Sequence, residues 1–418
     1  MNTDSVSGSA ANMPMATAQW GIVGLCMLFN LIDGLDVMAM AFTAGSVAEE
    51  WSLNGVQTGM LLSAGLVGMA CGSIVAAPIA VRHGRHRLLV ISLLLSGVGM
   101  LISFKSPGIG PLLSARFMTG IGVGVMLVMA NVLTYEHASP DRRGLAVALQ
   151  SMAFALGAVL CGALAHGLND TAGWRYVFLT GGCITLGAAV IAACCFRESR
   201  HGQAFSHDTR ERPLHGEDPP RMMRKDAYRL LFSAEQWQKT ASLALAFFLL
   251  MFGFYFVMSW TPTLLMQSGF SEHNGAAGGM LLNAGGMLGA LTVGLGANRF
   301  GCRQLLLGCL LLNTGLMAIM VPVTQVPGLS IAAGCLAGLL LNGAVAALYN
   351  LTAQAFTAPL RTSGVGLVLA TARLGAILSP AVAGLLLDSG WTHQGLFTFY
   401  AGSQLLASLL LWFPGRRA

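Results

Sequence analysis

Twelve apolar runs constrain the fold of this chain more than any other feature, because each is long enough to cross about 30 Å of hydrocarbon. The runs are continuous, whereas the strands of a membrane β-barrel alternate apolar and polar residues over about ten positions. They cover approximately residues 19–43, 58–80, 88–104, 111–133, 145–166, 175–196, 240–265, 277–297, 304–323, 329–353, 365–387 and 396–413. The sequence therefore predicts an all-α integral membrane protein with twelve transmembrane helices.

The composition excludes a soluble enzyme with a single membrane anchor. Only 10% of the residues are charged, against roughly 25% in an average soluble domain. Glycine accounts for 53 of the 418 residues, and small residues let helices approach closely in lipid. The cysteines show no disulfide framework and no metal-ligand spacing. No phosphate-binding loop typical of an ATPase occurs either.

The basic residues predict the orientation of the chain. Most of them face one side when both termini are cytoplasmic, and only Lys105 and Arg175 then reach the outer face. Because cytoplasmic loops carry an excess of Lys and Arg, we expect a multi-pass protein of the inner (cytoplasmic) membrane with both termini inside. The expected units are a tail (1–18), a six-helix half (19–196), a charged cytoplasmic linker (197–239), a second six-helix half (240–413) and a tail (414–418).

The two predicted halves repeat each other in sequence. The segment Arg82-His-Gly-Arg-His-Arg follows the second apolar run, and Arg299-Phe-Gly-Cys-Arg-Gln follows the eighth. Arg143-Gly and Arg361-Thr-Ser-Gly follow the fourth and tenth runs at nearly the same offset. Duplicated halves of this kind place a substrate site between them, near the membrane midplane.

Three segments resemble the major facilitator superfamily. They are the basic loop after the second run, Arg116-Phe-Met-Thr-Gly-Ile-Gly-Val-Gly in the fourth run, and Gly173-Trp-Arg-Tyr-Val-Phe at the start of the sixth. The resemblance covers nearly the whole chain. It implies the major facilitator fold and secondary transport by alternating access, without enzymatic activity and without a cofactor other than protons as the coupling ion.

Five further segments resemble the aromatic acid:proton symporter branch of that superfamily. They are Asp33-Gly-Leu-Asp, Asn131-Val-Leu-Thr-Tyr-Glu-His-Ala-Ser-Pro, Ser259-Trp-Thr-Pro, Asn283-Ala-Gly-Gly and Ala372-Arg-Leu-Gly-Ala-Ile. The resemblance implies that the substrate is an aromatic acid carried together with protons.

The expected cytoplasmic gate consists of basic residues after the second and fourth runs, namely Arg82, Arg85, Arg142 and Arg143. The family usually carries Gly and, four residues later, Asp in front of the first of these arginines. This chain has Ala77 and Val81 instead. The carboxylate that normally pairs with the loop arginines is therefore missing, so the departure concerns the strength of this gate and leaves the predicted fold unchanged.

Asp33 and Asp36 lie on one face of the first predicted helix. A carboxylate inside a membrane helix costs at least ~2.5 kcal/mol on insertion scales and marks a functional site, so we assign proton coupling to both residues. A hydrated or salt-bridged role is the alternative for Asp36. Arg116 is assigned to tune proton release, with a structural bridge as the alternative. Glu136 is the fourth residue assigned to proton coupling, and a role in an interfacial gate is its alternative.

Arg373 lies about 13 Å into the eleventh run, and we expect it to anchor an anionic substrate. Its planar guanidinium offers two donors that match a carboxylate. A structural ion pair with Asp33 or Asp36 is the alternative. Polar and aromatic side chains of the seventh, eighth and tenth runs suit an aromatic ring, and from them we select four residues. These are Trp260, Asn283, Tyr349 and Asn350.

The sequence thus predicts a proton-coupled importer of a small organic anion, with an aromatic carboxylate favoured. The alternatives are a proton-driven efflux antiporter and an importer of a non-aromatic organic acid. Antiporters usually carry a Gly-Pro pair in the fifth helix, and its absence between Gly157 and Gly162 favours import. The expected partners are the substrate and the lipid bilayer. We expect a monomer. We expect no nucleic-acid partner, because the basic residues form only short clusters between the apolar runs.

Overall fold

The computed structural model describes residues 17–139, 143–168, 172–195, 230–233, 236–267, 272–320 and 327–412. Within these ranges the chain forms twelve long helices. Those of the first half are α1 (Thr17–Glu50), α2 (Gly55–His83), α3 (Arg85–Phe104), α4 (Ile109–His137), α5 (Arg143–Leu168) and α6 (Arg175–Cys195). Those of the second half are α9 (Trp237–Gln267), α10 (Glu272–Phe300), α11 (Cys302–Ala318), α13 (Pro327–Ala355), α14 (Ala358–Asp388) and α15 (His393–Trp412).

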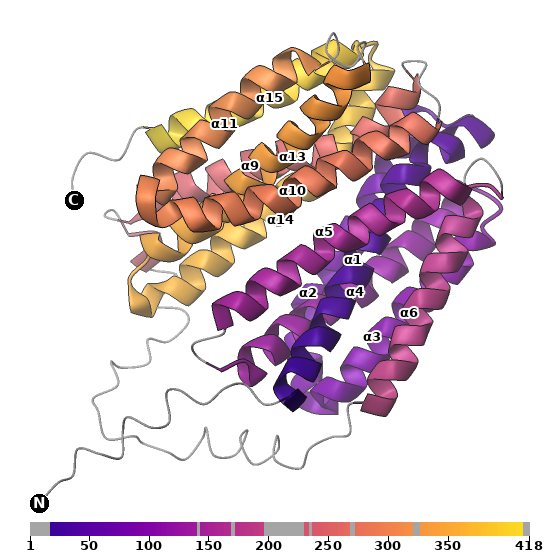
Figure 1. Ribbon diagram of the computed structural model, residues 1–418, viewed down its shortest axis with the longest axis horizontal. Helices are drawn as coiled ribbons and strands as arrows, with labels where there is room; N and C mark the ends of the chain where they lie inside the picture. The colour runs from indigo at the N-terminus through magenta and orange to yellow at the C-terminus, as the bar shows by residue number, and fades with distance from the viewer. Residues whose placement is uncertain are drawn as a thin grey trace, which may run out of the picture.

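The helices form two bundles, which confirms the predicted fold class. Figure 1 shows them side by side, one coloured indigo to magenta and the other orange to yellow. Nine helices of the described ranges are long and apolar enough to cross a membrane. Several extend beyond the apolar runs: α9 begins at Trp237, three residues before the predicted span, and α1 has 34 residues. Polar residues at helix ends continue the helix outside the apolar core, where hydropathy alone does not detect them.

Two glycines with positive φ support the predicted sequence repeat. Gly84 separates α2 from α3 with φ 85°, and Gly301 separates α10 from α11 with φ 81°. An L-residue with a side chain rarely adopts this backbone conformation, whereas glycine adopts it at little cost. The two repeated basic loops therefore share the same chain reversal.

Glycine also brings α2 and α4 into backbone contact. A Cβ added at Gly120 of α4 would collide with the carbonyl oxygen of Gly65, and one at Gly68 of α2 would collide with that of Phe117. Small residues at such positions allow the close approach on which helix association in lipid depends. The packing of α4 matters for function because this helix carries Arg116.

We expect Gly120→Ala to lower the thermal stability of the purified protein, because the new methyl group meets a backbone atom that cannot move aside. Overpacking of this kind typically costs about 1–3 kcal/mol. Gly110→Ala near the start of α4 is the matched control, since nothing lies within 4 Å of a Cβ there. Thermal unfolding in detergent measures both variants. Equal melting temperatures for the two would contradict the close contact between α2 and α4.

The halves meet mainly through three helix pairs: α2 packs against α14, α5 against α10, and α1 against α9. The backbones come closest between residues 55–63 of α2 and 377–388 of α14, which we call the gate end. There a Cβ at Gly59 or Gly384 would collide with the backbone of the other half. Further along these two helices, the last hydrogen bond between them in the described residues joins Arg373 to Met69. We call the opposite end, where α2 leads into α3 and no described hydrogen bond joins α2 to α14, the open end.

Candidate functional site

An ion pair between α4 and α1 forms the rigid part of the site. Arg116 Nη1 lies 2.9 Å from Asp36 Oδ1, and Arg116 Nη2 donates to Asp36 Oδ2 at 3.2 Å and to the Asp36 carbonyl oxygen at 3.0 Å. Both side chains are almost fully buried, with 3% and 2% exposed. Phe178 of α6 packs its ring 5.5 Å from the Arg116 guanidinium. This two-pronged pairing holds Asp36 in one position.

Asp33, one helical turn before Asp36, is buried without a comparable partner. Only 4% of its surface is exposed. Its Oδ1 atom has no hydrogen-bond partner in the described part of the chain. The electrostatic neighbours of Asp33 are Arg373 of α14 and Asp36, yet no described basic side chain comes within ion-pair distance of it. A buried carboxylate left unpaired in this way is costly as an anion, which suits a group that binds and releases a proton.

Arg373 reaches across the interface between the halves. Its Nη1 atom donates to the thioether sulfur of Met69 at 3.6 Å, a weak acceptor for a cation. The side chain is exposed, and among the described residues it forms no ion pair. Tyr255 of α9 and Tyr349 of α13 both lie within its electrostatic range. A guanidinium that has one weak acceptor among the described residues can bind a carboxylate.

A small cavity of about 20 Å³ lies between the halves, beside the ion pair. Its lining includes Asp36 and Arg116 from the first half, together with Tyr255 and Ser259 from α9. Met69, the residue that Arg373 contacts, also lines it. Tyr255 therefore borders both the ion pair and the surroundings of Arg373. Tyr255 belonged to the polar set noted in the sequence but not to the four selected residues, because sequence alone does not reveal which face of α9 points between the halves.

The four selected aromatic and amide residues occupy different surroundings. Trp260 is 1% exposed and donates from Nε1 to the Pro380 carbonyl oxygen at 3.1 Å. Asn283 is 3% exposed and donates to the Gly279 carbonyl oxygen at 2.9 Å. Tyr349 and Asn350 are both exposed. The ring of Tyr349 packs edge-on against Phe247 with centroids 5.0 Å apart. Tyr349 thus lies within electrostatic range of Arg373. The Trp260 side chain instead joins α9 to α14, and the Asn283 amide also donates to the Met38 sulfur of α1 at 3.8 Å.

The remaining predicted residues lie toward the open end. Arg82 and Arg85 are exposed at the α2–α3 connection. Arg143 begins α5 and Glu136 lies near the end of α4, but their side chains, like Arg142 as a whole, lie outside what the structure describes. Within the described ranges, no group of three His, Cys, Asp or Glu residues could hold a metal ion.

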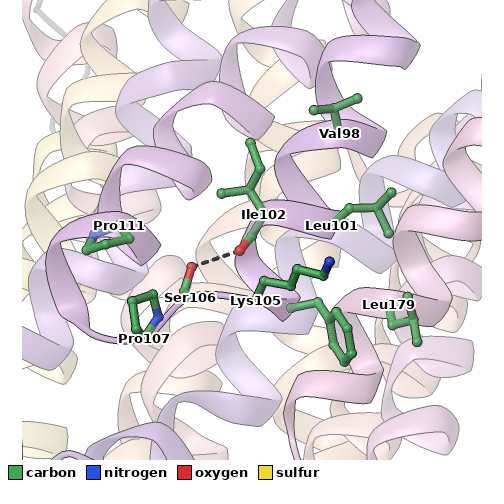
Figure 2. Close-up of a pocket in the computed structure, with 9 residues that line it drawn as sticks. Val98, Leu101, Ile102, Lys105, Ser106, Pro107, Pro111 and Leu179 are labelled. Atoms are coloured by element: carbon green, nitrogen blue, oxygen red, sulfur yellow. Dashed lines mark hydrogen bonds between the residues drawn. The ribbon is translucent and has the colours of Figure 1, made fainter.

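A second cavity lies away from the interface between the halves. It measures about 460 Å³ and is bordered by α3, α6 and the segment that leads into α4. Figure 2 shows its mainly apolar lining, including Val98, Leu101 and Leu179, with Lys105 as the one charged side chain. Ser106 is not free to bind a ligand there as a donor, since its hydroxyl donates to the Ile102 carbonyl oxygen at 2.9 Å. The cavity lacks the convergent polar groups of a substrate site.

We expect Arg116→Met to destabilise the protein strongly, because it leaves the Asp36 carboxylate buried without its partner. Removing one member of a buried ion pair costs about 3–5 kcal/mol. The double variant Asp36→Leu/Arg116→Met removes both charges and should recover most of the loss. Thermal unfolding of the three proteins in one detergent measures this. A single variant as stable as the parent protein would show that the pair makes no structural contribution.

Comparison with known proteins identifies relatives over nearly the whole chain. The model of the Major Facilitator Superfamily matches residues 26–322 and 284–418. The chain is 30% identical to the 4-hydroxybenzoate transporter PcaK of Pseudomonas aeruginosa, covering 96% of this chain and 94% of that protein. It is also 30% identical to the 3-(3-hydroxy-phenyl)propionate transporter of Escherichia coli, covering 99% and 96%. The gallate transporter of Pseudomonas putida is 29% identical, covering 95% and 93%.

Solved structures share the fold at lower identity. The D-xylose-proton symporter superposes with a TM-score of 0.73 at 16% identity, covering 94% of this chain and 97% of that chain. A bacterial homologue of the human lysosomal transporter Spinster gives a TM-score of 0.73 at 17% identity, covering 96% and 95%. At these identities the likeness establishes the arrangement of the helices.

Proposed function

Because the chain belongs to the major facilitator superfamily of secondary transporters, we propose that it imports a small aromatic carboxylate together with protons. The family membership makes the chain a multi-pass membrane transporter and not an enzyme. The substrate class, the coupling ion and the direction of transport are the steps proposed here. The aromatic acid transporters among its relatives support the substrate class.

The observation that carries the proposal is the position of Arg373. Among the described residues, this cation between the two halves has only a thioether as hydrogen-bond acceptor, and Tyr255 and Tyr349 lie within its electrostatic range. A substrate carboxylate replaces the Met69 sulfur and supplies both guanidinium donors with charged acceptors, which are about twice as strong as neutral ones. The substrate ring then packs against the tyrosines, and the exposed Asn350, which follows Tyr349 in α13, is assigned to polar substituents.

The two aspartates have different roles in proton coupling. Asp36 is fixed by its ion pair with Arg116, which holds α1 to α4. Asp33 is the proton carrier, because it is buried, unpaired at Oδ1 and within electrostatic range of Arg373. Substrate on Arg373 neutralises the cation that favours ionised Asp33, so the anion and the proton bind together. Glu136 then has no part in the central exchange and is assigned to the cytoplasmic end of α4.

The orientation follows from the basic residues: both termini and the open end face the cytoplasm, in the inner membrane. In this state the halves are joined at the gate end, and we infer that the exposed Arg373 is reached from the cytoplasmic side. Alternating access then requires the gate end to separate while the arginines of the α2–α3 connection approach the other half.

A ligand screen by thermal shift tests the proposal, because a ligand that binds the folded state raises its stability with concentration. The panel contains benzoate, hydroxybenzoates, phenylpropionates, nicotinate, non-aromatic acids and neutral sugars. Aromatic acids are expected to stabilise the protein, and an inward pH gradient across proteoliposomes should drive their accumulation. Stabilisation by non-aromatic acids alone would favour the importer of that class, and substrate loss from vesicles against the gradient would favour an efflux antiporter.

A further inference from the structure

Asp388, the last residue of α14, binds the first turn of a helix in the other half. Its Oδ1 and Oδ2 atoms accept hydrogen bonds from the backbone N–H groups of Gly55 and Val56, at 2.6 and 2.9 Å. These residues begin α2. The contact therefore ties the end of α14 directly to the start of α2 across the interface between the halves.

The start of α2 is built to receive a carboxylate. The first N–H groups of a helix have no partner within the helix and form the positive end of its dipole. Asn54 caps α2 locally, but its side chain takes the N–H of Gln57 at 2.8 Å. The N–H groups of Gly55 and Val56 remain for Asp388. The two caps are thus complementary: Asn54 of the first half satisfies the N–H of Gln57, and Asp388 of the second half satisfies those of Gly55 and Val56.

The position of Asp388 within its own helix is unfavourable. A carboxylate in the last turn of α14 faces the negative end of that helix dipole. Within the described ranges it also forms no ion pair with a basic side chain. Its stabilising interactions thus come from α2 of the opposite half, and they exist only while the gate end is closed.

The backbones around this contact are packed without space for side chains. A Cβ at Gly384, one turn before Asp388, would collide with the Gly55 carbonyl oxygen. About two turns further into α2 than Gly55, Ser63 donates to the Ile377 carbonyl oxygen at 2.9 Å. Opening this end therefore separates a continuous seam, and Asp388 supplies the charged contact in it.

We propose that Asp388 is the latch of the gate end, whose release from Gly55 and Val56 is required before Arg373 becomes accessible from that side. The latch sets the population of the state shown in Figure 1 relative to the oppositely open state. This role requires alternating access but no particular substrate. A failure of the aromatic acid assignment would therefore leave it untouched.

Hydrogen exchange measured by mass spectrometry on the full chain in lipid nanodiscs tests the latch. In Asp388→Asn, exchange at the first amides of α2 should rise about tenfold, the effect of weakening two charge-assisted bonds at a helix start. Exchange around Gly84 and Gly301 at the open end should fall, because the population shifts toward the state closed there. A purely structural defect raises exchange at both ends.

Two further variants complete the experiment. Glu49→Gln removes an exposed carboxylate at the end of α1 and is expected to change neither end. Gly384→Ala separates the same seam without changing charge, so it should shift exchange in the same opposed directions and remains informative if Asp388→Asn fails to fold. Exchange that is unchanged, or that rises at both ends, in the folded variants would overturn the assignment of Asp388 as a latch.

Discussion

Replacing Asp33 by asparagine is expected to abolish the accumulation of substrate driven by a pH gradient. One coupled proton and a gradient of one pH unit can support about a tenfold concentration ratio, since one unit corresponds to about 1.4 kcal/mol. Asparagine is nearly isosteric with aspartate but carries no titratable proton. The variant should therefore equilibrate substrate across proteoliposomes with a final ratio near one.

The same variant should still bind substrate. Asp33 lies within electrostatic range of Arg373 but forms no ion pair with it, so the neutral side chain leaves the anion site intact. Thermal stabilisation by substrate and exchange between labelled and unlabelled substrate should survive in Asp33→Asn. Glu49→Gln, which removes an exposed carboxylate, should accumulate substrate normally. Undiminished accumulation by Asp33→Asn would remove this residue from the coupling mechanism.

The helices and their division into halves were predictable because their signals are local. An apolar run of about 20 residues has few alternatives to a membrane helix. Glycine at the repeated loops, such as Gly84 and Gly301, reports a backbone conformation that depends on its neighbours in sequence alone. The ends of the helices were harder to predict from the sequence, because α1 and α9 continue into polar segments that hydropathy does not identify as helical.

The pairing within the site was not predictable, because it depends on how each helix is rotated. Arg116 and Asp36 are 80 residues apart, and the sequence left Arg116 and Arg373 as alternative partners for either aspartate. The structure pairs Asp36 with Arg116 and gives Asp33 no ion pair among the described side chains. The rotation of α9 about its axis also determines that Trp260 donates a hydrogen bond to the Pro380 carbonyl oxygen within the second half. A uniformly apolar helix such as α9 gives little indication of its inner face.

No role was assigned to Asp388 from the sequence, although the scarcity of acidic residues in the second half pointed to it. The segment 240–413 contains only Glu272 and Asp388 as acidic residues, so a carboxylate at the end of α14 was conspicuous. Its partner could not be inferred, because the acceptors of its charge are backbone N–H groups that every residue except proline carries. Contacts between a side chain and a distant backbone leave no pattern in a single sequence.

Replacing Arg373 by lysine is expected to weaken substrate binding by about one to two orders of magnitude. Hydrogen bonds to charged groups contribute about 1.5–3 kcal/mol, and each 1.4 kcal/mol corresponds to a tenfold change in affinity. Lysine keeps the positive charge but replaces the planar, two-pronged donor by a single ammonium group. The concentration of aromatic acid needed for half-maximal thermal stabilisation should rise accordingly, and uptake at low substrate should fall in parallel.

Arg299→Lys is the matched control, since it makes the same substitution at an exposed residue at the end of α10. It should leave both the ligand-dependent stabilisation and the uptake at the level of the parent protein. The melting temperatures of the two variants without ligand should be similar, because among the described residues Arg373 has only the weak contact with Met69 to lose. Normal affinity for aromatic acids in Arg373→Lys would show that charge alone suffices, and the two-pronged carboxylate anchor would then be wrong. Equal stabilisation of both variants by neutral sugars would place the substrate outside the organic anions altogether.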